Sequence, residues 1–162
     1  MATADDVAAA ILELTGPLDT FKLQKLVYYS QAWHLVWEEE PLFEEPIEAW
    51  VGGPVVPDLY ARHRGSFRVD RWQWGDSQRL TDEQRESVSA VVASYGRLSG
   101  RQLSRLTHNE APWRDARGAL GPGERGHSVI APGAMQDYYS GIDQSEEATL
   151  VSDLPSVDEE SF

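Results

Sequence analysis

The segment from residue 20 to about residue 38 constrains the fold most, because it predicts a helix with apolar residues on two opposite sides. At 100° per residue, one stripe collects Leu23, Leu26, Val27, Ser30, Trp33, His34 and Trp37. The opposite side still carries Phe21, Tyr28, Ala32, Leu35 and Val36. A helix that is apolar on both sides is packed on both sides. We therefore expect a central helix in a helical bundle, with both tryptophans in the core.

Shorter helices and one small antiparallel β element are predicted around this helix. Caps and helix formers predict helices over about residues 7–14, 58–64, 81–98, up to 107, and 133–139. Residues 47–51 are rich in β-branched and aromatic side chains and predict a strand, with a second brief strand at 129–131. Gly52-Gly53-Pro54 predicts a turn after the first strand. The fold class is mainly α (α+β), in one domain over residues 1–142.

The net charge of −13 is concentrated at the C-terminal end of the chain. Residues 143–162 carry seven acidic residues and no lysine or arginine, and this composition predicts a disordered acidic tail. A negative field favours a basic partner and disfavours nucleic acid and anionic membranes. No apolar run approaches the ~20 residues of a membrane span, and the N-terminus lacks the basic residues of a signal peptide. We expect a cytoplasmic protein.

Signals for catalysis or for a cofactor are weak in this sequence. Cysteine is absent, and the four histidines lack the i, i+3 or i, i+4 spacing that helical metal ligands use. No GxSxG, P-loop or GxGxxG motif occurs. The sequence therefore predicts a protein that is not an enzyme and that needs no metal and no cofactor. His108 and Glu110 form an HxE pair in a loop, which is a weak metal-ligand signal. A minority hydrolase hypothesis is built around His108.

Residues 62–74, RHRGSFRVDRWQW, interleave four arginines with three aromatic residues. Cations with stacking rings are typical of single-stranded nucleic-acid binding, so a nucleic-acid-binding regulator is one interpretation. Arginine stems that cover apolar surface are the simpler interpretation. Tryptophan and arginine are also the residues most enriched at protein–protein hot spots. Under this third interpretation, Trp72 and Trp74 are exposed anchors for a protein partner.

The sequence does not decide the role of four polar or amphipathic residues on the central helix. Gln24, Tyr28 and Gln31 share one ridge of the helix, and Lys25 lies on a neighbouring ridge. These side chains either form the solvated edges of a core helix or contact a partner. As candidate partner-binding residues we take Gln24, Lys25, Tyr28, Gln31, Trp72 and Trp74.

Ordered motifs along the chain resemble the Panacea domain, a family of bacterial and phage antitoxins. They are KLQKLVYYSQAWHL at 22–35, PLFEEPIEAWVGGPVVPDLY at 41–60, LSRLTHNEAPWRDAR at 103–117 and GAMQDYY at 133–139. Gly52 departs from the family pattern, in which an aromatic or larger residue usually precedes Gly53-Pro54. The chain also lacks the additional DNA-binding domain that some members carry. The similarity spans roughly residues 4–140.

The resemblance implies a mostly helical module that binds and neutralises a toxin encoded beside it. At least one relative delivers its toxin to a protease, so an adaptor is the alternative to direct inhibition. The resemblance also implies structural roles for Trp50, Gly53, Pro54, His108, Pro112 and Trp113. For Trp50 we expect a ring buried against the central helix. The identity of the toxin and the oligomeric state stay open.

Overall fold

A computed structural model describes residues 1–144 and residue 162. Its helices are α1 (Ala4–Thr15), α2 (Thr20–Glu38), α3 (Pro57–His63), α4 (Asp82–Tyr95), α5 (Gly100–His108), α6 (Ala111–Arg117) and α7 (Pro132–Gln144), with a 3-10 turn η1 (Ser77–Arg79). Its strands are β1 (Leu18–Asp19), β2 (Glu48–Trp50), β3 (Gly53–Val55) and β4 (Arg68–Val69). The predicted mainly α (α+β) class is confirmed. Helix α7 runs past the predicted domain end at residue 142, and residues 145–161 of the predicted tail lie outside the described residues.

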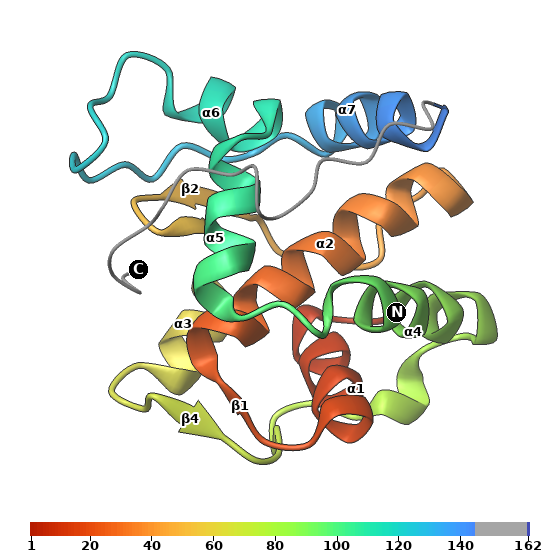
Figure 1. Cartoon of the computed structure of the whole chain (residues 1–162). Helices are drawn as coiled ribbons and strands as arrows, with labels where there is room; N and C mark the ends of the chain where they lie inside the picture. Colours follow the sequence, from red (N-terminus) through yellow and green to blue (C-terminus); the bar gives the residue numbers. More distant parts are fainter. Residues whose placement is uncertain (145–161) are drawn as a thin grey trace.

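Helix α2 is the central helix, as the two-sided apolar pattern predicts. It contacts α1, α4, α5 and α7, and Figure 1 shows it between α7 above and α1 and α4 below. Every residue from Leu23 to Leu35 is buried. Each fully buried leucine on this helix contributes about 1.5–3 kcal/mol to folding.

The last turn of α2 departs from the prediction for Trp37. Its ring is 42% exposed and stacks on the ring of Trp33, with the two centroids 5.4 Å apart. The exposed residues begin at this position, just before the helix ends at Glu38, and the C-cap residue Glu39 has a φ of 58°. The expected core position of Trp37 is therefore wrong, because the surrounding segments leave the last turn of α2 partly uncovered.

Local capping signals account for most helix boundaries. Thr3, Thr81 and Ser99 each form a reciprocal capping box at the start of α1, α4 and α5. Helix α6 was not predicted, although it has a proline in its first turn and Gly118 after its last residue. Those two signals frame only seven residues, too few for a periodic pattern to stand out.

Two short antiparallel pairs complete the fold. In the β2–β3 hairpin Glu48 pairs with Val55 and Trp50 pairs with Gly53, so the chain reverses one position before the predicted turn. The predicted strand at 129–131 is present as a single bridge between Glu48 and Val129. Strands β1 and β4 pair within regions where no strand was predicted.

Candidate functional site

The β2–β3 hairpin is held by side chains of the segment from residue 104 to residue 117. Four successive backbone carbonyl oxygens face this segment. Ser104 Oγ donates to Gly52 at 2.7 Å, His108 Nε2 lies 3.0 Å from the oxygen of Val51, Trp113 Nε1 donates to Trp50 at 2.8 Å, and Arg117 Nη1 donates to Ala49 at 3.4 Å. Since buried carbonyls need partners, these bonds fix the hairpin against α5 and α6.

His108 has a structural position in this arrangement. Its two ring nitrogens face the backbone oxygens of Ser104 and Val51, and its ring centroid lies 3.9 Å from that of Trp113. Burial lowers the pKa of His108, while the two backbone contacts oppose that shift. Ser104 is fully buried and its hydroxyl already donates to Gly52. Ser104 Oγ lies 3.4 Å from His108 Nδ1, but because this hydroxyl is buried and already bonded, the pair gives no support to the hydrolase hypothesis.

Glu110, the second residue of the HxE pair, lies in a buried cluster of tyrosines. Its Oε1 accepts hydrogen bonds from Tyr29 at 2.6 Å and Tyr139 at 2.8 Å, and the Tyr28 hydroxyl lies 3.0 Å from that of Tyr139. Burial raises the pKa of Glu110 to about 7, although both hydrogen bonds act to lower it. This cluster joins α2, the start of α6 and α7. Tyr28 is accordingly an interior residue, 1% exposed.

The two glutamines of the predicted partner surface bind backbone groups inside the protein. The Gln24 amide donates to the oxygen of Val56 at 3.2 Å and accepts from its N–H at 2.9 Å. The Gln31 amide donates to Phe43 at 2.7 Å and accepts from the N–H of Leu42 at 2.7 Å. Each side-chain amide thereby hydrogen-bonds the backbone of a loop that covers α2, both as donor and as acceptor.

Lys25 is enclosed beneath the hairpin. Its Nζ lies 4.0 Å from the centroid of the Phe21 ring. A Cβ atom on Gly53 would be 2.7 Å from Lys25 Cε, and Gly53 has a φ of +125° that side chains rarely adopt. The turn thus requires glycine for its dihedral angle and for the space above the lysine.

The expectation that Gln24, Lys25, Tyr28 and Gln31 lie on an accessible surface is wrong. All four are at most 2% exposed. The reason is that segments on both sides of α2 cover these positions and use their polar groups as internal hydrogen-bond partners.

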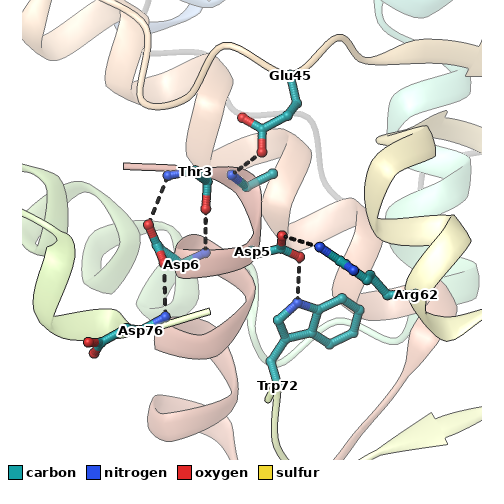
Figure 2. A network of polar contacts seen from close by, with 8 residues as sticks. Thr3, Asp5, Asp6, Glu45, Arg62, Trp72 and Asp76 are labelled. Carbon is teal, nitrogen blue, oxygen red and sulfur yellow. Dashed lines mark hydrogen bonds and ion pairs between the residues drawn. The ribbon is translucent and has the colours of Figure 1, made fainter. Parts of the chain in front are cut away.

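Trp72 is also interior, which corrects its expected role as an exposed anchor. Figure 2 shows its indole against the start of α1, where Nε1 donates to Asp5 at 2.8 Å. Arg62 reaches the same carboxylate at 3.4 Å, and Asp6 accepts from the N–H of Asp76 at 2.8 Å. These contacts fasten residues 62–76 to the N-terminal helix. They also occupy groups that the nucleic-acid interpretation needs free for phosphates and bases.

Trp74, the remaining candidate, is 40% exposed. The guanidinium carbon of Arg62 lies 5.5 Å from its ring centroid. Phe67, in the same segment, is 70% exposed. The Arg-aromatic segment thus presents Trp74 and Phe67 outward while Trp72 faces inward.

A cleft of about 340 Å³ lies beside the hairpin, and sequence reasoning missed it. Its walls are Trp50, Val51, Tyr60, Arg64, Arg125, Gly126, His127 and Phe162. The Trp50 ring contacts the edges of Tyr60 and His127, at centroid distances of 4.9 and 5.6 Å. The expectation that this ring is buried against α2 is therefore wrong: the ring is half-buried and lines the cleft. Its neighbour Ala49 is the fully buried residue of the strand.

Among residues 1–144 and 162, which the structure describes, no three histidine, aspartate or glutamate side chains are grouped as a metal site would require. Among the same residues, no helix combines the length and apolar character needed to cross a bilayer.

Comparison with known proteins identifies the family. The model of the family "Antitoxin SocA-like, Panacea domain" matches residues 23–114, from α2 through the hairpin to α6. Antitoxin SocA of Caulobacter vibrioides (strain NA1000 / CB15N) is 30% identical over 118 residues, which cover 65% of this chain and 62% of that protein. The chain thus spans less than two thirds of the length of this curated relative, and no solved structure matches. The resemblance drawn from the sequence motifs is confirmed: the chain belongs to the Panacea-domain family of SocA-like antitoxins.

Proposed function

We propose that this protein is an antitoxin that binds a toxin protein encoded beside it and neutralises it by direct contact. The observation that carries the proposal is the family match, which includes most of α2, the hairpin, and the clamping residues Ser104, His108 and Trp113. The net charge of −13 supports a partner with basic surface, since opposite charge accelerates association. We place this interaction in the cytoplasm and assign the protein no catalytic role.

The contact surface that we propose consists of exposed and half-buried aromatic side chains rather than of the buried polar residues of α2. Trp74 and Phe67 lie on one exposed segment, and Trp50 and Tyr60 line the cleft. Aromatic side chains of this kind contribute a large share of binding energy when a partner covers them. Clamping of the hairpin would keep the cleft residues in a fixed position, which reduces the ordering cost of binding.

Co-expression with the neighbouring gene tests the proposal. We expect the neighbouring product alone to arrest growth, and we expect this chain to restore growth and to co-purify with that product. A buried-core variant such as Leu26→Asp serves as the negative control, because it removes the fold and should remove the rescue. Arrest that persists at equal protein levels would contradict the proposal.

Delivery to a protease is the alternative route to neutralisation. Toxin lifetime distinguishes the two routes: an inhibitor leaves the toxin present in a complex, whereas an adaptor shortens its half-life. We propose inhibition. No observation favours the nucleic-acid-binding regulator, since Trp72 is buried and Arg62 is paired with Asp5.

A further inference from the structure

We infer that the cleft beside the β2–β3 hairpin binds an acidic segment of the toxin that carries an aromatic side chain. The inference rests on the proposed function and assigns the chemistry of one contact within it. It combines two observations: an aromatic ring already seated at the cleft, and two arginines along its wall that form no ion pair with residues 1–144 or 162.

The seated ring is that of Phe162. Its centroid lies 5.1 Å from that of Phe21, 5.4 Å from that of His63 and 5.6 Å from that of Tyr60. These distances are typical of edge-to-face and tilted aromatic contacts. Since Phe162 also lines the cleft, the structure itself shows that an aromatic side chain fits this place. A partner's ring would make the same contacts after displacing Phe162.

The cations are Arg64 and Arg125, which line the same cleft and are exposed. Within residues 1–144 and 162, neither guanidinium takes part in an ion pair. His127 stands beside them, with Nδ1 3.4 Å from Glu48. Guanidinium groups favour carboxylates, which they can bind in a bidentate manner. On a chain of net charge −13 these two arginines are a local positive patch, which favours an acidic segment at the cleft over other positions on the surface.

The hairpin side of the cleft is held in place by the interior. The backbone oxygen of Trp50 accepts from Trp113, and that of Val51 lies 3.0 Å from His108 Nε2. The Trp50 indole is further fixed by its hydrogen bond to Glu48 at 2.8 Å. A site whose walls are already ordered loses less entropy on binding.

A peptide binding experiment tests the chemistry without the toxin. The probe is a fluorescein-labelled DLPSVDEESF peptide, which copies the acidic and aromatic residues of 153–162. The protein is the full chain with Phe162→Ala, so that its own ring does not compete. We expect saturable fluorescence anisotropy, and weaker binding to the unsubstituted chain. Replacing the phenylalanine of the probe by alanine should abolish binding.

Charge reversal localises the binding. Adding Arg64→Glu and Arg125→Glu to the Phe162→Ala protein should weaken its affinity for the probe by about tenfold, since two attractive contacts between arginine and carboxylate become repulsive. The matched control adds Arg97→Glu and Arg101→Glu, which change the net charge equally at exposed positions that do not line the cleft. Equal affinity for cleft and control variants, with unchanged unfolding transitions, would overturn the inference.

The toxin assay separates this inference from the proposed function. For this assay the cleft variant and the control variant are each made in the natural chain, with Phe162 kept. We expect the cleft variant to lose co-purification with the toxin and rescue of growth, and the control variant to keep both. If the cleft variant rescued growth as well as the natural chain does, the inference would be overturned and the proposed function would stay intact. Failure of the natural chain itself would overturn the proposed function, and the peptide arm would still decide the ligand chemistry of the cleft.

Discussion

Replacing Glu110 by glutamine should stabilise the protein above neutral pH. The Glu110 carboxyl group is 6% exposed, and its Oε1 accepts from Tyr29 and Tyr139. Glutamine keeps an oxygen acceptor for both hydroxyls and cannot ionise. The variant therefore retains the neutral form of the cluster at every pH.

The size and sign of the effect follow from the pKa of Glu110. Burial raises this pKa from 4.5 to about 7, so the folded state holds a proton that the unfolded state has released between these values. The folded state is consequently favoured at low pH, and this contribution is lost as pH rises from 4.5 through about 7. At 1.36 kcal/mol per unit, the shift corresponds to about 3 kcal/mol.

Buried histidines give the opposite slope in an overlapping range. Burial lowers the pKa of His63 from 6.5 to about 4, so its contribution to stability is lost as pH falls through this window. The stability profile of the natural protein is therefore a mixture of both slopes. The difference between Glu110→Gln and the natural protein isolates the carboxyl group, because the histidine contribution cancels.

Urea unfolding at pH 5 and pH 8 measures this difference. We expect Glu110→Gln to exceed the natural protein by about 2–3 kcal/mol more at pH 8 than at pH 5. Glu86→Gln, at an exposed position, is the matched control and should show less than about 0.5 kcal/mol. A difference for Glu110→Gln that does not change between the two pH values would refute the reasoning.

Three further substitutions test the interior assignments by thermal or urea unfolding. Gly53→Ala should destabilise the protein by about 2–4 kcal/mol through its positive φ and the lysine beneath it, whereas Gly133→Ala, with no atom within 4 Å of the added carbon, should be near neutral; equal effects would contradict the turn geometry. Gln24→Ala should cost about 2–4 kcal/mol, because it leaves two buried backbone groups without partners; a loss of toxin binding at unchanged stability would contradict this role. Trp72→Ala should cost about 3–5 kcal/mol and Trp74→Ala less than about 1 kcal/mol; a reversed order would show that the inward and outward rings are misassigned.

The sequence predicts the framework of this fold well, because its signals are local. The two-sided apolar pattern of residues 20–38 and the capping residues Thr3, Thr81 and Ser99 act within one or two helical turns. Family motifs add the identity of the fold. None of these signals requires knowledge of which distant segment covers a given face.

The candidate site was harder to predict because its contacts are long-range. Gln24 binds Val56, which is 32 positions away, and Trp72 binds Asp5, which is 67 positions away. A ridge of polar residues on a helix looks the same whether solvent or a loop lies over it. Trp72 and Trp74 likewise differ only in which of them meets the start of α1.

The cleft has no sequence signature for the same reason. Trp50, Tyr60, Arg64 and Arg125 come from β2, α3, the residue after α3 and a distant loop, and only the tertiary fold brings them together. The four arginines among residues 62–74 do not indicate from the sequence which of them form ion pairs and which face the cleft. Arg62 is paired with Asp5, and Arg64 faces the cleft.

Titration of this protein into the purified product of the neighbouring gene, with toxin activity followed in the same samples, tests the central claim most directly. Direct neutralisation predicts saturable binding heat, a complex that elutes as one species, and toxin activity that falls in proportion to complex formed, with no protease present. Absence of a complex at about 100 μM of each protein, equivalent to binding weaker than about −5 kcal/mol, would contradict it.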